Sequence, residues 1–427
     1  MRLILFDLES EQRHNFYPLA LSRPIWELRC GITSLGQKMV VTVGASDIAC
    51  FVPPYMAEAY RERADWPVNN PGMLDDDDLF LVDTRVKASQ FQVKPTGPSE
   101  VGLTKDGRCL YARITRDDRA KIKTNDINEL LTLAAQMFPT AQAEVPLWNY
   151  TWELVLANPD QITEDFKACG RSGIEGDVEQ PNAVRGDAKD IYIAPGAVVH
   201  PMVVIDAENG PVYLDEDVEV HPFSRIEGPC YVGPKSILLG AKCREGNSLG
   251  PACRIGGEVE ESIIQGYSNK YHDGFLGHAY VGEWVNLGAL TTNSDLKNDY
   301  GNVELILDGK TRIDTGSNKV GALIGDHTKT SIGTLFNTGA YVGAMGMIMA
   351  TGKPLSKFIP DFAWLIEGNV TKGFGRKKMY ETAKIAMSRR KQQWTEAQQA
   401  MWEAIFEITA PPRNVAIQRG RHKLLNK

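Results

Sequence analysis

The chain has 427 residues, of which 43% are hydrophobic and 24% charged, a composition typical of a soluble globular protein that is too long for a single core. Its net charge of −7 argues against a general affinity for nucleic acid or anionic lipid. The charge is uneven, because the segment from Thr371 to Lys427 holds thirteen Lys or Arg and four Glu. A basic tail therefore follows an acidic body.

Cysteine usage and hydropathy favour a cytoplasmic location. The seven cysteines are scattered and form no C-x-x-C pair, which is typical of a reduced compartment and gives no zinc knuckle. The opening MRLILFDLES has an apolar run of only four residues, so we expect no signal peptide. The apolar stretch 340–352 is broken by glycine and too short to span a bilayer, so we expect no membrane partner.

Residues 1–168 predict a mixed α/β domain, because apolar strand-like runs alternate with helical patterns. The polar, glycine-containing segment 169–189 is interpreted as a linker. The expected strands are 2–8, 39–43 and 78–86, and the expected helices are 124–138 and 148–168.

Residues 190–350 show a period of six. Apolar residues, with one Thr, recur at this step in two separate runs, often beside Gly or Pro: Leu214, Val220, Ile226, Val232 and Leu238, then Ile324, Thr330, Phe336, Val342 and Ile348. A six-residue step places one short strand and one corner on each side of a triangular prism, so that eighteen residues make a coil. We expect a parallel β-helix of seven to eight coils, with a β-sandwich of accidental spacing as the alternative.

Residues 351–427 predict a basic helical tail. Its Met, Trp and Ile residues fall roughly on one face, which indicates a stripe that docks on the prism, and Pro411 and Pro412 are expected to stop the helix.

The polar segment 261–295 is the candidate site. It carries His272 among Ser, Asn, Lys, Asp and Thr side chains, on a scaffold that otherwise repeats aliphatic residues. A neutral imidazole can accept a proton at physiological pH, although a lone histidine in a repeat protein is more often a surface residue. The six-residue interval to His278 places the two rings on adjacent sides of the prism, so a zinc enzyme of the carbonic anhydrase type, which needs a close His pair, is not supported.

The stretch HDGFLGHAYVGEWVNLGA resembles the acetyltransferase half of the bifunctional N-acetylglucosamine-1-phosphate uridylyltransferase and glucosamine-1-phosphate acetyltransferase family. The resemblance implies a left-handed β-helix, a homotrimer with sites between subunits, and acetyl-CoA as the donor. It also implies that His272 is the general base. The substrate-binding residues that it implies are Glu258, Lys270, Asn286 and Lys319.

Three departures from the family pattern lie in the substrate pocket. Glu260 stands where the family has a substrate-binding lysine, Phe275 replaces a tyrosine, and Asp295-Leu296 replaces an Asn-Tyr pair. These changes remove a cation and hydroxyl groups that would bind a sugar phosphate. The acceptor is therefore expected to be an amino sugar phosphate or a nucleotide sugar, without a choice between them.

The N-terminal half resembles a sugar-nucleotidyltransferase domain more distantly, because it lacks the family's glycine loop for nucleotide phosphates. The resemblance implies nucleotide contacts at Arg23 and Arg29, and a Mg²⁺-binding carboxylate at Asp83, which could equally end a strand.

Three functions remain open at this point. The first is an acetyl-CoA-dependent acyltransferase of sugar-nucleotide biosynthesis with a doubtful N-terminal activity. The second is a sugar-1-phosphate nucleotidyltransferase with a purely structural β-helix. The third is a non-enzymatic binding scaffold in which both halves are degenerate.

Overall fold

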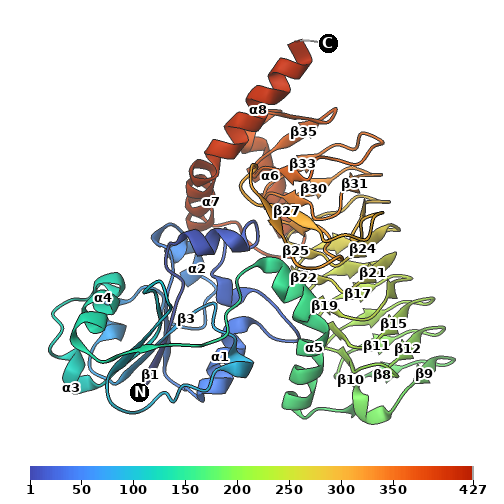
Figure 1. Cartoon of the computed structure of the whole chain (residues 1–427). Helices are drawn as coiled ribbons and strands as arrows, with labels where there is room; N and C mark the ends of the chain where they lie inside the picture. Colours follow the sequence, from blue (N-terminus) through green and yellow to red (C-terminus); the bar gives the residue numbers. More distant parts are fainter. Residues whose placement is uncertain (426–427) are drawn as a thin grey trace.

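The computed structural model describes residues 1–425 as an N-terminal α/β domain, a three-sided parallel β-helix and three C-terminal helices (Figure 1). Short 3₁₀ helices interrupt the loops, at Glu11–Phe16, Ile25–Glu27, Pro54–Met56, Pro71–Leu74, Ala88–Gln90 and Ala188–Asp190. Among these residues, none of the helices combines the length and the apolar character that a membrane crossing requires.

The α/β domain contains one mixed six-stranded sheet in the order β2-β1-β3-β5-β4-β6. Its apolar central strands are parallel to one another, and β3 is buried along its whole length. The strands are β1 Arg2–Phe6, β2 Ile48–Phe51, β3 Leu79–Asp83, β4 Glu100–Leu103, β5 Cys109–Ile114 and β6 Thr140–Gln142. The helices are α1 Leu35–Val43, α2 Ala57–Arg61, α3 Arg116–Arg119, α4 Ile127–Met137 and α5 Thr151–Cys169.

The run 39–43, expected as a strand, is the second half of helix α1. The Val residues of this run favour a strand locally. Ser34 and Gln37 form a capping box at the start of the helix, and Gly44 ends it in the left-handed conformation at φ +69°. The two end signals therefore outweigh the strand propensity of the run.

The β-helix has three faces. The first face is a ten-stranded sheet formed by β7 Gly173–Ile174, β10 Ile191–Ile193, β13 Val212–Leu214, β16 Cys230–Val232, β19 Asn247–Leu249, β22 Ile263–Gly266, β25 Tyr280–Glu283, β29 Leu323–Ile324, β32 Tyr341–Val342 and β34 Phe358–Ile359. Successive strands of this face pair in parallel.

The second and third faces have the same parallel arrangement. The second face holds β8 Asp177–Val178, β11 Val198–Val199, β14 Glu219–Val220, β17 Ile237–Leu238, β20 Arg254–Ile255, β23 Asn269–Lys270, β30 Lys329–Thr330, β33 Met347–Ile348, β35 Trp364–Ile366 and the antiparallel β36 Asn369–Thr371. The third face holds β9 Ala183–Arg185, β12 Val204–Asp206, β15 Arg225–Glu227, β18 Lys242–Cys243, β21 Glu258–Glu260, β24 Phe275–Gly277, β26 Thr292–Asn293 and β31 Leu335–Phe336.

The hexapeptide residues fill the interior of the prism, as the period predicts. Leu214, Val220 and Ile226 lie on the first, second and third faces in turn, and all three are fully buried in one continuous core. Ile324 and Val342 of the second run both lie on the first face and are fully buried in the same core. The predicted fold class, an α/β domain followed by a hexapeptide β-helix and C-terminal helical structure, is confirmed.

The β-helix is longer than the predicted seven to eight coils, because both of its ends lie outside 190–350. The segment 169–189, interpreted as a linker, contains β7, β8 and β9 and forms most of the first coil. No further coil packs against the outer side of this first coil, and its Ile174 is 52% exposed. Because an end coil buries little surface, most of its residues are polar. At the other end, residues 351–371 contain β34, β35 and β36, so only the remainder of the tail is helical.

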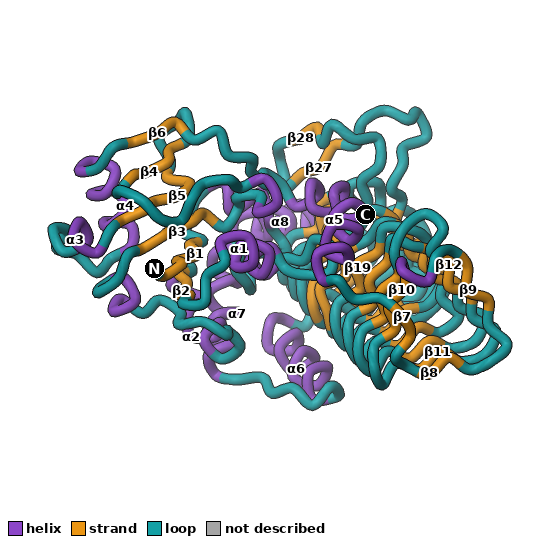
Figure 2. The backbone as a smooth tube through the Cα atoms, turned by 90° about the horizontal axis from the view of Figure 1, so that it is seen from below, coloured by secondary structure: helices purple, strands orange, loops and turns teal. Residues whose placement is uncertain are grey.

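Helices join the two domains. α5 lies between the α/β domain and the first face, where it contacts β16, β19 and β25 (Figures 1 and 2). The C-terminal helices are α6 Gly375–Ser388, α7 Glu396–Ile408 and α8 Ala410–Leu425. Buried Met379, Trp402 and Ile405 share a core with residues of both domains. The prediction that Pro411 and Pro412 stop a helix is incomplete, because both prolines also lie in the first turn of α8, where proline is tolerated.

Candidate functional site

His272 lies at the corner between β23 on the second face and β24 on the third face, and its side chain is exposed. The centroids of its ring and the ring of Tyr271 are 5.9 Å apart. Among residues 1–425, no side chain or backbone group forms a hydrogen bond with either ring nitrogen of His272. The imidazole is therefore available to a ligand that approaches this corner.

Lys270 holds the corner from inside the prism. It is 2% exposed and in register with the core residue Ile255. Its Nζ donates hydrogen bonds to the carbonyl oxygens of Gly256 at 2.9 Å and His272 at 2.5 Å, and burial lowers its pKa to about 8. A Cβ at Gly257, where φ is +65°, would lie 2.7 Å from this Nζ. The structure thus places Lys270, predicted to bind substrate, beneath the surface, where it fixes the backbone that carries His272.

Two of the other predicted residues, Glu258 in β21 of the third face and Lys319 in the loop before β29, are linked through Glu260 and Arg244. Glu260 is 5% exposed and accepts hydrogen bonds from Arg244 Nη1 at 2.6 Å and from Lys319 Nζ at 3.3 Å. Arg244 Nη1 also lies 3.9 Å from a carboxylate oxygen of Glu258. A band of alternating charge therefore lies on the face that begins at the His272 corner.

His278 lies at the opposite corner of the same strand, β24, and is only 2% exposed. Its Nδ1 lies 2.8 Å from Asp295 Oδ2, and its Nε2 lies 3.1 Å from Glu261 Oε2. Burial alone would lower the pKa of His278, but the hydrogen bonds with Asp295 and Glu261 outweigh it and raise the pKa to about 9. Both ring nitrogens therefore donate, and His278 is a structural cation rather than a free base.

This network predicts a pH dependence of stability. Because the folded-state pKa of His278 is raised from 6.5 to about 9, its contribution is fully present below pH 6.5 and is lost as the pH rises through about 9. The loss amounts to at most about 3 kcal/mol. The free energies of unfolding of the parent chain and of His278→Gln, measured by urea titration, should differ most at pH 6 and become similar towards pH 9.5. His272→Gln, which changes an exposed imidazole, is the control, and a pH-independent difference for His278→Gln would contradict the assignment.

Asn286 lies on the second face, where it pairs with Asn269 and Lys329, whereas Glu258 lies on the third face. Its Oδ1 accepts a hydrogen bond from Asn269 at 3.1 Å, and Asn269 Oδ1 accepts one from Arg390, just after α6, at 2.9 Å. Asn286 lines a cavity of about 250 Å³ between this face and α6, together with Lys329, Arg389 and Arg390. Burial lowers the pKa of Lys329 to about 7.

The two arginines predicted to contact nucleotide lie at the interface between the domains. Arg23 is 1% exposed, and its guanidinium forms ion pairs with Asp326 and, at 3.3 Å, with Glu283, both on the β-helix. The backbone N–H of Arg29 donates to the Tyr280 hydroxyl at 2.8 Å, and the Arg29 guanidinium bonds the carbonyl oxygen of Ile32. Because the guanidinium of Arg23 is buried against two carboxylates of the β-helix, this placement argues against a phosphate contact there.

Asp83 follows the pattern of a strand-end carboxylate, but its oxygens are already engaged. Arg85 donates from Nε to Oδ1 at 3.0 Å and from Nη2 to Oδ2 at 2.9 Å. The neighbouring Asp7 accepts from Arg13 Nε at 3.2 Å and from the backbone of Ile25 at 2.8 Å. A Mg²⁺ ion needs carboxylate oxygens free for coordination. This donor set does not fit Mg²⁺.

Sequence analysis missed Arg244 and Glu261, which complete the charged band and the His278 network. For Arg244, the parallel register of the strands could have indicated this contact. Lys242 pairs with Glu258, and this pairing places Arg244 beside Glu260. It also missed a His–Glu–His cluster near the N-terminal end of the prism, formed by His200, Glu219 and His221. The two histidines are 21 residues apart, close to one coil, and this spacing could have found them.

Comparison with known proteins supports the resemblance. Residues 3–172 match the family model described as sugar nucleotidyl transferase. A bifunctional sugar-1-phosphate nucleotidylyltransferase/acetyltransferase from Sulfurisphaera tokodaii is 36% identical over 33% of this chain and 35% of its own length. Bifunctional protein GlmU from Rippkaea orientalis is 32% identical over 33% of this chain and 30% of its own, and that from Synechococcus elongatus is 26% identical over 56% and 47%.

A solved structure, an Arabidopsis UDP-N-acetylglucosamine acyltransferase, aligns with 58% of this chain and 94% of its own at 11% identity and a TM-score of 0.24. The chain spans about a third to a half of the length of the curated relatives described above. The predicted resemblance is confirmed: the N-terminal segment matches the sugar nucleotidyl transferase family, and the chain is similar to bifunctional nucleotidylyltransferase/acetyltransferase proteins.

Proposed function

We propose that the protein is an acyltransferase that transfers an acetyl group from acetyl-CoA to the amine of an amino sugar phosphate or a nucleotide sugar. The observation that carries this proposal is the exposed imidazole of His272, with both nitrogens free, on a corner that Lys270 holds from inside. The substrate amine attacks the thioester carbonyl carbon while the imidazole accepts its proton. The C–S bond then breaks, and the thiol leaves with that proton.

The acceptor is proposed to bind on the third face, beside His272. Arg244 and Lys319 supply cations for a phosphate, but each already pairs with Glu260. A phosphate would have to compete with the Glu260 carboxylate for these two cations. Hydroxyl or amine groups of a sugar could instead donate hydrogen bonds to the carboxylate directly. The charged band therefore favours an acceptor with both an anionic and a hydrogen-bond-donating part.

The donor is proposed to use the cavity beside Asn286. Arg389 and Arg390 lie at its rim, and both are in the basic tail that sequence analysis offered as a counter-charge for CoA phosphates. A tail that only neutralises the acidic body would not need arginines at a cavity. Lys329 also lines this cavity, and its Nζ donates hydrogen bonds to the carbonyl oxygens of Trp284 and His327.

Arg389→Ala should raise the KM for acetyl-CoA about tenfold and leave kcat within about twofold, because one charge-assisted contact to a phosphate is lost while the catalytic corner is untouched. Initial-rate kinetics with varied acetyl-CoA measure both constants. Lys384→Ala, an exposed cation on α6 that does not line the cavity, is the control. Equal KM values for the two variants would place the donor elsewhere.

A homotrimer is proposed as the active form. The support for it is the resemblance of the β-helix segment to an acetyltransferase family whose sites lie between the subunits of a trimer. The flat sides of neighbouring prisms can join around a three-fold axis. Analytical ultracentrifugation tests this, with three times the mass of one chain expected. We also propose a cytoplasmic location, since all seven cysteines are free thiols.

The activity is tested by incubating the protein with acetyl-CoA and a panel of amino sugar phosphates and nucleotide amino sugars, and following release of free thiol. Acetyl-CoA binding in calorimetry without turnover would point to a missing acceptor. Absence of binding would favour the scaffold function instead.

A sugar-1-phosphate nucleotidyltransferase is the second candidate, because the family model matches residues 3–172. The engaged carboxylates of Asp7 and Asp83 count against it in this conformation. Pyrophosphate release from a nucleoside triphosphate and a sugar 1-phosphate, in a buffer containing magnesium, tests this candidate separately from acetyl transfer.

A further inference from the structure

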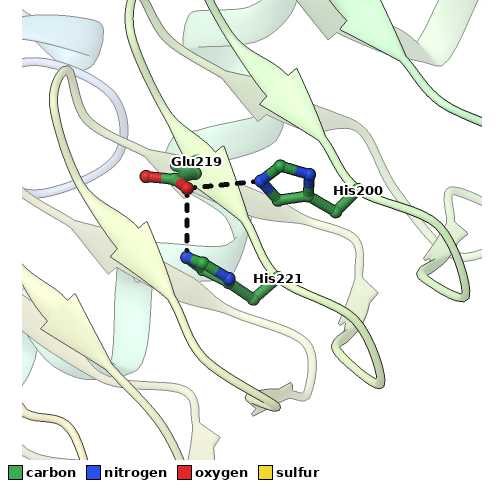
Figure 3. Close-up of side chains that lie close together, drawn as sticks. All are labelled: His200, Glu219 and His221. Carbon is green, nitrogen blue, oxygen red and sulfur yellow. Dashed lines mark hydrogen bonds and ion pairs between the residues drawn. The ribbon is translucent and has the colours of Figure 1, made fainter.

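A cluster of metal-ligating side chains lies on the outer surface of the second face, near the N-terminal end of the prism. His200 follows β11, and Glu219 and His221 flank the last residue of β14 in the next coil (Figure 3). All three side chains are partly exposed. The cluster lies several coils from His272 and has no part in the function proposed above.

The geometry of the cluster matches a tetrahedral metal site. His200 Nε2 and His221 Nε2 each lie 3.2 Å from the same oxygen, Glu219 Oε1. A zinc ion with bonds of about 2.0–2.1 Å and tetrahedral angles holds neighbouring ligand atoms about 3.3 Å apart. One potential ligand atom from each of the three residues lies within 4.8 Å of those of the other two, so a single ion can reach all three.

The remaining nitrogen of His200 has the partner that metal-binding histidines usually have. Its Nδ1 lies 3.2 Å from Glu179 Oε2, in the first coil. A carboxylate that accepts from the second ring nitrogen fixes the tautomer and presents the other nitrogen as a neutral ligand. Glu179, His200 and His221 thus come from three successive coils, and the parallel register Val178–Val199–Val220 places them in one column.

We propose that His200, Glu219 and His221 bind one Zn²⁺ ion, with the fourth position open to solvent and Glu179 orienting His200. Two imidazoles and one carboxylate form a ligand set that zinc accepts, while the hard cations Mg²⁺ and Ca²⁺ prefer oxygen alone. Because the ligands come from the second and third coils, the ion joins the two coils. It would stabilise the end of the prism that has no further coil beneath it.

The experiment uses the full chain without an affinity tag, stripped with a chelator and titrated with ZnCl₂ against a chromophoric zinc indicator. We expect one tightly bound equivalent per chain. His221→Ala and Glu219→Gln should each weaken binding at least about 100-fold, and Glu179→Gln about 10- to 100-fold. His422→Ala, which removes an exposed histidine of the tail, should leave binding unchanged, and Cys169→Ser is the matched control for the exposed thiol.

Two further measurements separate this site from other binding. In the first, bound Co²⁺ should give the visible absorption of a tetrahedral ion without a thiolate charge-transfer band. In the second, zinc should raise the midpoint temperature of the first thermal unfolding transition of the parent chain but not that of His221→Ala. The proposal is overturned if no equivalent of zinc is retained, if His200→Ala/His221→Ala binds as the parent does, or if the Co²⁺ spectrum shows thiolate ligands.

Discussion

His272→Ala should lower the turnover of acetyl transfer by about 10² to 10⁴, the usual contribution of a positioned general base. The fold should be intact, because the His272 side chain is exposed and forms no hydrogen bond with any other group among residues 1–425. The loss should fall on kcat rather than on the KM for acetyl-CoA, since the base acts on the amine in the transition state. Initial rates by thiol release measure it.

One control variant and one second variant accompany this prediction. His422→Ala removes an exposed histidine from the tail and should retain parental activity. Lys270→Met keeps His272 but removes the bonds from Nζ to the carbonyl oxygens of Gly256 and His272, so it should lower kcat by misplacing the base. If His272→Ala acetylates as fast as the parent, the proposed reaction is wrong and only the architecture stands.

The hexapeptide period predicted the interior of the prism well, because each coil buries the same few positions and this constraint is local in sequence. Val220 and Leu238, taken from the period alone, are fully buried and lie in one column with Ile255. The ends were missed for a physical reason. The first coil has a neighbouring coil on one side only. It therefore tolerates exposed and polar residues such as Asp177 and Arg185, and the aliphatic pattern is lost there.

The site residues remain predictions, and the structure shows only where they lie. His272 was singled out because a polar segment interrupts an aliphatic repeat, and the structure places its side chain at an exposed corner. Lys270 was predicted to bind substrate, but its register with the core residue Ile255 places its side chain inside the prism. That register cannot be counted from sequence, because Leu238, Ile255 and Lys270 are separated by 17 and then 15 residues rather than by a constant 18.

Contacts between the domains lay beyond sequence analysis altogether. Arg23 and Asp326 are 303 residues apart in the sequence, and no local sequence pattern predicts that they form an ion pair. Arg23, read by itself after a strand and before a proline, resembles a phosphate-binding residue. Its actual partners are Asp326 and Glu283, because the α/β domain docks on the first face at this point.

The Arg23–Asp326 pair predicts the second large effect. Asp326 is 3% exposed and accepts hydrogen bonds from the Ser22 hydroxyl, from the Arg23 guanidinium and, at 2.8 Å, from the backbone N–H of Glu283. Asp326→Ala leaves the buried Arg23 with Glu283 alone and should destabilise the docked domains by about 3–5 kcal/mol. Ser22→Ala removes only one neutral donor and should cost about 1 kcal/mol.

The double variant Arg23→Met/Asp326→Leu separates a buried, unpaired charge from simple loss of packing. When both charges are replaced by apolar side chains, no ion is left in the interface, so the double variant should be more stable than Asp326→Ala. Urea titration measures this on the first unfolding transition, because a two-domain chain need not unfold in one step. Destabilisation below about 1 kcal/mol in Asp326→Ala, or a double variant no more stable than Asp326→Ala, would show that this ion pair does not hold the α/β domain against the prism.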